Sequence, residues 1–123
     1  MKEDFITALH LQPHEHPRPV TLKNTLDGLQ TTVGGLIEFV YLSDGFMLLV
    51  NDEGKLLGLE PNRRLGCDVL VGDVYVVKDD GEGDLTSLSP EELVMFTAAF
   101  HEPAEDITAE EAEAAAGFLF FPC

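Results

Sequence analysis

Apolar residues in this sequence occur only in short runs, and these runs limit what the chain can fold into. The longest is the five residues from Phe46 to Val50, whereas a helix that crosses a bilayer needs about twenty apolar residues. The runs alternate with glycine, proline, aspartate and asparagine, which favour turns. We therefore expect short strands and helices, and the 123 residues suit one domain, 1–123.

Most of the runs have the composition of strands, with β-branched and aromatic residues or with alternating apolar residues. Strands are predicted over residues 5–11, 20–22, 36–42, 46–51, 55–59, 68–71 and 74–77. The turn Ser43-Asp44-Gly45 joins two of them into a hairpin. With the strand at 55–59 this hairpin becomes a meander, 36–59, which we expect at the centre of a mostly antiparallel sheet. Pro61 to Arg64 is expected to leave the meander as a loop.

Capping motifs predict the helices. Ser89 begins a capping box, followed by proline in the first turn, which predicts a helix over 90–100. A second capping box predicts a helix over 109–116, and Asn24 is expected to cap a short helix over 25–33. The predicted fold class is therefore α+β, with the sheet packed against these three helices.

The charge balance is the most unusual feature of the composition. The chain has 23 acidic residues and seven Lys and Arg residues, so its formal net charge is −16. Direct binding to DNA or RNA is not expected, because phosphates are neutralised by Lys and Arg, and an anionic membrane is disfavoured for the same reason. Three explanations stay open: solubility or adaptation to high salt, steering toward a basic protein, and imitation of nucleic-acid phosphates.

Two acidic segments are candidates for contact with a partner protein. The first is the predicted loop that contains Asp79, Asp80, Glu82 and Asp84. The second is the pair Asp52 and Glu53, which follows a predicted strand. Neither segment has the ligand spacing of an EF-hand, so we expect no calcium site.

Positive charge gathers at one place, Asn62-Arg63-Arg64. Guanidinium groups bind phosphate or carboxylate through paired hydrogen bonds, so this segment is a candidate anion site. A nucleotide bound there could meet Asn51 or Glu38 at its base or ribose. The alternative is that the arginines form ion pairs that position the loop.

Five segments in order resemble one family. They are Leu29-Gln30-x-x-Val33-Gly34-Gly35-x-Ile37-Glu38, Val50 to Leu56, Pro61-Asn62-Arg63, Val71 to Val74, and Gly81-x-Gly83-Asp84 leading to Ser89. Together they resemble a domain of unknown function, family number 3846, found in phages, plasmids and bacterial genomes. The resemblance covers roughly residues 5–100. It implies a small α+β domain carried by mobile elements, and it implies no catalytic residues.

Motifs for cofactors and for catalysis are absent from the sequence. No glycine-rich phosphate loop is present, and the two cysteines lack the spacing of a zinc or redox motif. His10, His14 and His16 are the only metal-like cluster, but prolines surround them, and we interpret them as solvated histidines in a loop. We therefore expect no metal, no cofactor and no enzymatic activity.

The function expected from the sequence is binding of another protein. A small acidic domain of mobile-element type would place its acidic surface on a basic host protein, as an inhibitor, a DNA mimic or a counter-defence factor. The amino terminus lacks the features of a signal peptide, so the expected location is the cytoplasm of the host cell. The alternative is a small-ligand module, or a sponge for a nucleotide, built on Asn62, Arg63 and Arg64.

Overall fold

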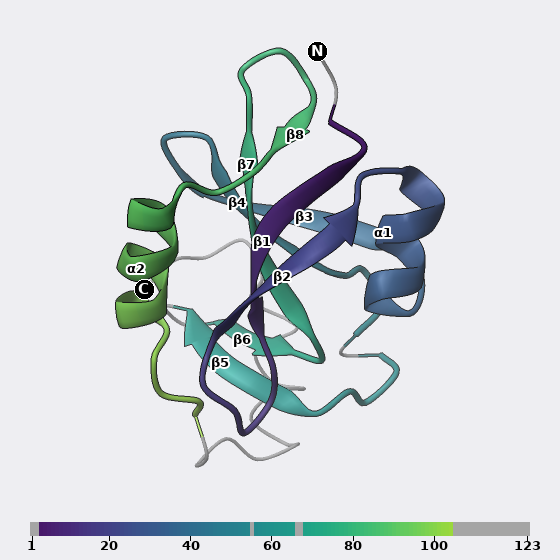
Figure 1. Cartoon of the computed structure of the whole chain (residues 1–123). Coiled ribbons are helices and arrows are strands. Elements are labelled where there is room, and N and C mark those ends of the chain that lie inside the picture. The colour runs from purple at the N-terminus through teal and green to yellow at the C-terminus, as the bar shows by residue number, and fades with distance from the viewer. Residues whose placement is uncertain (1–2, 55, 66–67, 105–123) are drawn as a thin grey trace.

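The computed structural model describes residues 3–54, 56–65 and 68–104. These residues form the predicted α+β fold, with two helices and two sheets (Figure 1). In chain order the elements are β1 (Phe5–Leu11), β2 (Arg18–Lys23), α1 (Leu26–Val33), β3 (Ile37–Ser43), β4 (Phe46–Asn51), β5 (Pro61–Leu65), β6 (Asp68–Val71), β7 (Val74–Asp79), β8 (Leu85–Thr86) and α2 (Pro90–Ala99). The predicted helix 109–116 lies outside the described residues.

The larger sheet is antiparallel and has β7 at its centre. Its strand order is β2-β1-β7-β4-β3, and β8 pairs with the end of β7. On either side of Val76 lie Leu9 of β1 and Leu48 of β4. All residues from Val74 to Val77 are buried, which explains why this strand has a continuous apolar run instead of an alternating one.

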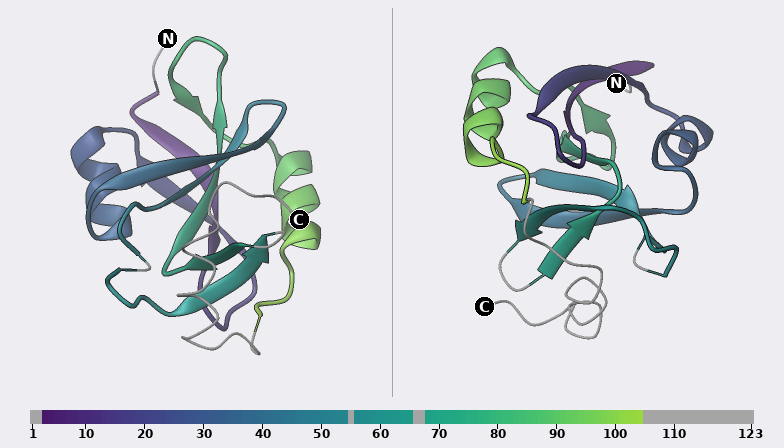
Figure 2. Two further views of the ribbon diagram at one scale, coloured as in Figure 1. Left: turned by 180° about the vertical axis from the view of Figure 1, so that it is seen from behind. Right: turned by 90° about the horizontal axis from the view of Figure 1, so that it is seen from below.

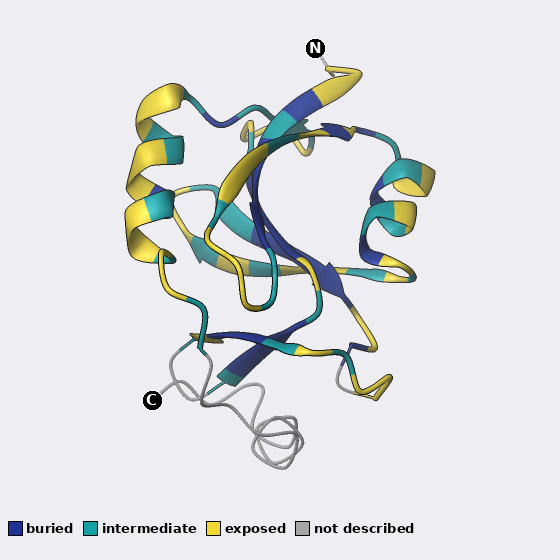
Figure 3. Ribbon diagram, turned by 60° about the horizontal axis from the view of Figure 1, so that its bottom comes forward, coloured by how far each residue is buried: buried dark blue, intermediate teal, exposed yellow. Residues whose placement is uncertain are grey.

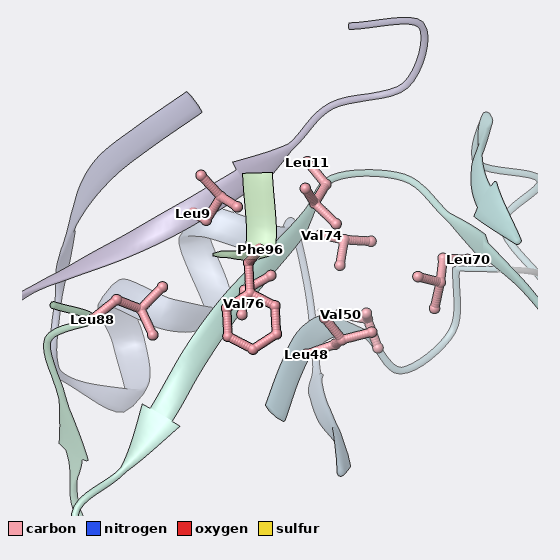
Figure 4. Packing of buried hydrophobic residues seen from close by; sticks show 9 residues of the cluster. All are labelled: Leu9, Leu11, Leu48, Val50, Leu70, Val74, Val76, Leu88 and Phe96. Carbon is pink, nitrogen blue, oxygen red and sulfur yellow. The ribbon is translucent and has the colours of Figure 1, made fainter. Parts of the chain in front are cut away.

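Each face of the larger sheet packs against one of the two described helices. The two helices lie on opposite sides of the sheet (Figures 1 and 2). On one face, Phe96 of α2 packs with Leu48 and Val76 in a cluster that Figure 4 shows. On the other face, Leu29 of α1 packs with Leu49. Successive side chains of a strand point to opposite faces, so neighbouring residues of β4 enter different clusters.

The predicted hairpin of β3 and β4 is confirmed, but the predicted meander is wrong. Residues 52–54 and 56–58 form turns, and the Leu57 amide donates to the Glu53 carbonyl oxygen. Leu56 and Leu57 are exposed, so their apolar character does not reflect a place in a sheet. The hairpin therefore lies at one side of the sheet, with β3 as an edge strand.

A second correction concerns the segment from Pro61 to Arg64. It was expected as a loop, but it belongs to β5, which pairs with β6 in a separate two-stranded sheet. The strand predicted at 68–71 is confirmed, although it pairs only with β5 in the described residues. This small sheet lies beside the larger one, at the end shown at the bottom of Figure 3.

The two described helices begin at caps. The capping box at Ser89 is confirmed: its hydroxyl accepts the Glu92 amide, and the Glu92 carboxylate accepts the Ser89 amide. The predicted cap of α1 is wrong by one residue, because Thr25 accepts the Gly28 amide at 3.0 Å. Neither of these helices is both long and apolar enough to span a membrane.

Candidate functional site

Three parts of the chain meet at one end of the larger sheet, and each carries carboxylates. They are the start of β1, the turn between β3 and β4, and the loop between β7 and β8, at the top of Figure 1. The Asp79 amide donates to the Gly45 carbonyl oxygen at 2.8 Å, and the Glu3 carboxylate accepts the Ser87 amide at 3.2 Å. We call this surface the acidic end. Its acidic residues are Glu3, Asp4, Asp44, Asp79, Asp80, Glu82 and Asp84.

Hydrogen bonds to two of its own carboxylates shape the loop between β7 and β8. Asp79 Oδ1 accepts the Gly81 amide at 2.8 Å. Asp80 Oδ1 accepts the Glu82 amide at 2.7 Å and the Asp84 amide at 3.3 Å. These local turns, typical of aspartate, give the backbone of the loop a defined shape and hold the carboxylates of Asp79 and Asp80 against it.

A pocket of about 330 Å³ opens at the acidic end, between α1 and the loop that precedes β8. Its apolar lining includes Leu29 of α1, Ile37 of β3 and Met47 of β4. Asp79 and Asp84 also line it and add negative charge. The pocket therefore combines apolar residues with two acidic residues, which suits a ligand that is both apolar and positively charged.

Exposed apolar side chains extend the lining of the pocket. Leu26, which is 61% exposed, and Phe39, which is 40% exposed, belong to both the pocket and the surface. Large apolar side chains that remain in water next to a pocket are typical of contact surfaces. The pocket could not be predicted from the short apolar runs of the sequence, because it forms only when α1, β3 and β8 come together.

Asn24 is a structural residue of this site that the sequence did not reveal. It was expected to cap α1, but its side-chain amide donates to the carbonyl oxygens of Glu3 at 2.9 Å and Leu85 at 3.4 Å. Its backbone amide donates to the Asp4 carbonyl oxygen at 2.8 Å. Asn24 is 4% exposed and lines the pocket, so it joins the start of β1 and β8 to the start of α1.

Two described lysines lie near the acidic end: Lys23, exposed at the end of β2 and in register with Phe5, and Lys78, which is paired. The Lys78 ammonium group lies 2.8 Å from the Glu92 carboxylate of α2. That hydrogen bond, with a second from the Ser89 backbone amide, lowers the pKa of Glu92. This ion pair offsets the positive charge of Lys78 locally, so it leaves the negative charge of the acidic end in place.

The second predicted acidic segment lies elsewhere. Asp52 and Glu53 follow the last residue of β4, whereas the acidic end adjoins the first residue of that strand, Phe46. Both carboxylates are exposed. The structure therefore separates the predicted partner-binding residues into two groups at opposite ends of β4.

The residues of the predicted anion site do not share one surface. Asn62 is fully buried and Arg63 is 2% exposed, whereas Arg64 is exposed. A register shift between Pro61 and Arg63, typical of a β-bulge, lets the consecutive residues 62 and 63 both face inward. The geometry of Asn62 and Arg63 thus does not support binding of a phosphate from solvent.

Arg63 and Asn62 instead hold backbone segments together. The Arg63 guanidinium donates to the carbonyl oxygens of Gln12, Glu15 and Phe100 and to the Asn62 side-chain oxygen. Asn62 Nδ2 donates to the carbonyl oxygens of Leu11 and Gly72, both at 2.7 Å. The two side chains therefore join the end of β1 to the segments around β5 and α2.

Asn51 and Glu38 belong to the hairpin of β3 and β4. Asn51 is buried, and its Nδ2 donates to the Val33 carbonyl oxygen at the end of α1 at 3.1 Å. Its Oδ1 accepts the Glu53 amide at 2.8 Å. Glu38 is exposed on the edge strand. Asn51 therefore fixes the end of α1, which is a structural role.

The three predicted loop histidines have different surroundings. His10 is buried within β1, so its interpretation as a solvated histidine is wrong. Its ring stacks on Tyr75 at 4.4 Å, and its Nε2 lies 3.0 Å from Asp73 Oδ1. Burial, together with the charge of Asp73, raises the pKa of Tyr75 to about 12. His14 and His16 are exposed, as expected.

Comparison with known proteins identifies a family. The chain matches the model of a family described as a domain of unknown function, DUF3846, over residues 6–101. No curated protein and no solved structure gives a significant match. The matched range contains both sheets, both described helices and the acidic end from Asp44 to Asp84. This chain belongs to the DUF3846 family.

Proposed function

We propose that this protein is a non-enzymatic binding protein that docks its acidic end on a basic partner protein. The partner would contribute Lys or Arg side chains to the carboxylates and an apolar side chain to the pocket. The observation that carries the proposal is the pocket itself, whose lining joins apolar residues of the sheet to the acidic residues Asp79 and Asp84.

The fixed shape of the acidic loop favours docking over a role in solubility alone. Carboxylates that only keep a protein soluble need no defined arrangement, whereas those of Asp79 and Asp80 are held by backbone amides. A surface that is ordered before it binds loses less conformational entropy when the partner arrives. The negative charge would also steer a basic partner to this end and accelerate association.

The size and charge of the pocket favour a protein side chain over a nucleotide. A volume of about 330 Å³ is near the lower limit of ligand pockets, which hold about 300–1,000 Å³. A nucleotide phosphate would be repelled by Asp79 and Asp84. An aromatic or aliphatic side chain, flanked in sequence by basic residues, fits both properties.

The proposed setting is the cytoplasm of a host cell that carries a phage or plasmid, where the partner would be a basic host protein. Inhibition of that protein, as a counter-defence factor, is the form of activity that this setting favours. If the partner binds DNA, the carboxylates of the acidic end would take the places of phosphates. A duplex oligonucleotide should then compete with the protein for the partner.

The experiment has two steps. The partner is captured from host lysate, identified, purified and then titrated against the protein between about 50 and 300 mM NaCl. Because docking depends on charge, affinity should fall at least tenfold over this range. The double variant Glu82→Gln/Asp84→Asn should weaken binding by about tenfold or more at low salt.

The matched control is Asp52→Asn/Glu53→Gln, which also removes two negative charges but at the other end of β4. It should bind the partner with nearly the affinity of the unmodified protein. If the two double variants weaken binding equally, net charge alone is responsible and the acidic end is not the docking site. An affinity that does not change with NaCl concentration would contradict the proposal as a whole.

A further inference from the structure

The fold brings together two histidines that are far apart in the sequence. His16 lies between β1 and β2, and His101 follows α2. Their rings stack with centroids 4.3 Å apart, and Glu102 lies beside them. One ligand atom from each of His16, His101 and Glu102 lies within 4.8 Å of the others. From this cluster we infer a binding site for a divalent transition metal such as Zn²⁺, formed by these three side chains.

The hydrogen bonds of the two rings favour metal binding. His16 Nδ1 lies 2.8 Å from the His101 carbonyl oxygen and must carry the hydrogen of that bond, so in the neutral ring the lone pair is on Nε2. His101 Nδ1 lies 2.8 Å from Glu102 Oε1, which favours the same tautomer there. Histidines that bind metals commonly donate their other ring nitrogen to a carbonyl or carboxylate oxygen in this way.

The backbone on both sides of the cluster is anchored. The buried Arg63 guanidinium donates to the carbonyl oxygens of Glu15 and Phe100, the residues just before His16 and His101. The Ala104 amide donates to the Asn62 carbonyl oxygen at 3.1 Å, shortly after Glu102. One buried side chain therefore fixes the spacing of the two backbone segments that carry the histidines, and only the side chains have to turn when a metal binds.

Metal binding requires the two rings to turn out of their stacked arrangement, because stacked rings do not direct their nitrogen lone pairs at one point. Ligand atoms around tetrahedral zinc lie about 3.3 Å apart, since each is about 2.0 Å from the metal. All three side chains are exposed, so rotation about their side-chain bonds can bring the ligand atoms from 4.8 Å to that spacing. Two histidines and a carboxylate are a common set for zinc, with water in the fourth position. The excess of carboxylates would also raise the local concentration of cations.

Zinc titration of the untagged full chain tests the site, monitored by competition with a chromophoric chelator and by imidazole NMR signals. One equivalent of Zn²⁺ should bind, and the signals of His16 and His101 should shift while those of His10 and His14 stay in place. His16→Ala and His101→Ala should each lower the affinity about tenfold or more. Zinc should also raise the Tm of the unmodified protein, because it binds the folded state.

The control variant is His14→Ala, which removes an exposed histidine of the same connector that lies 3.0 Å from Glu60. Its zinc affinity should match that of the unmodified protein. The site would be disproved if the double variant His16→Ala/His101→Ala bound zinc as tightly as the unmodified chain. A zinc-induced shift of all four histidines would equally contradict it. Neither result depends on the acidic end, so this inference and the docking proposal fail separately.

Discussion

The buried guanidinium of Arg63 is surrounded by oxygen acceptors. Three backbone carbonyl oxygens and the Asn62 side-chain oxygen accept hydrogen bonds from it, so the charge is solvated by the protein in place of water. These acceptors come from three separate segments of the chain. Arg63 therefore holds these segments together, and its removal would leave several buried oxygens without hydrogen-bond donors.

Replacement of Arg63 by alanine should lower the free energy of unfolding by about 2–4 kcal/mol, because buried acceptors lose their partners. Arg64→Ala, at the exposed neighbouring position, should change it by less than about 0.5 kcal/mol. Urea denaturation measures both values. Equal losses in the two variants would show that the interior contacts of Arg63 do not contribute to stability.

Because of Tyr75, the free energy of unfolding should fall as the pH rises above about 10. Its pKa is raised to about 12, chiefly by burial, so the folded state retains the phenol proton where an unfolded chain, with an ordinary value near 10, has lost it. The stabilisation is thus complete below pH 10 and is lost as the pH rises toward 12. In a Tyr41→Phe variant, the tyrosinate absorbance should rise with a midpoint near 12. A midpoint near 10 would contradict the burial of Tyr75.

At the scale of elements, Glu92 stabilises α2 and its packing against the sheet. Its carboxylate accepts the Ser89 amide and pairs with Lys78 of β7, so it both caps the helix and fixes it to the sheet. Glu92→Gln should lower the free energy of unfolding by about 1 kcal/mol at neutral pH. Glu91→Gln, at an exposed position of the same turn, should have a smaller effect.

The contribution of Glu92 should disappear in acid. Its pKa is lowered in the folded state, so the stabilisation is present above the ordinary value of 4.5 and is lost as the pH falls through the lowered value. The difference between Glu92→Gln and the unmodified protein should therefore shrink below about pH 4. A difference that stays constant down to pH 2 would show that the charge of Glu92 is not involved.

Elements defined by local signals were predictable from the sequence. The capping box of α2 and the turn between β3 and β4 involve residues within four positions of one another, so pattern alone was sufficient. The segment 55–59 was misjudged because apolar composition does not distinguish a strand from an exposed turn. The strand β5 was missed because its partner, β6, is required to recognise it.

The sites depend on contacts between distant residues, which no single sequence displays. Adjacent arginines suggested an anion site, but the β-bulge turns Arg63 inward and leaves Arg64 outside. His16 and His101 are 85 positions apart, and only the fold brings them together. The acidic loop 79–84 was predictable because its turns are local, and its role in binding a partner stays a prediction.

At the scale of the whole molecule, the net charge of −16 should oppose folding through mutual repulsion of the carboxylates. Raising NaCl from about 10 to 150 mM shortens the screening length from about 30 to 8 Å. The Tm should therefore rise, by about 4 °C for each 1 kcal/mol gained. Differential scanning calorimetry measures this rise.

The Tm of the variant Glu82→Gln/Asp84→Asn should rise less with NaCl than the Tm of the unmodified protein, because the variant has less repulsion at the acidic end. A Tm that does not change with NaCl would contradict the repulsion. Folding that requires molar salt would instead support the explanation that the acidity is an adaptation to a saline environment.

The central claim is that the acidic end, with its pocket, is the surface that contacts a partner. Hydrogen exchange of the protein with and without its purified partner locates that surface directly. Binding should slow exchange in residues 79–85 and in the first turn of α1, and leave the turns at 52–54 unchanged. Protection confined to the turns at 52–54, or to the small sheet of β5 and β6, would contradict the claim.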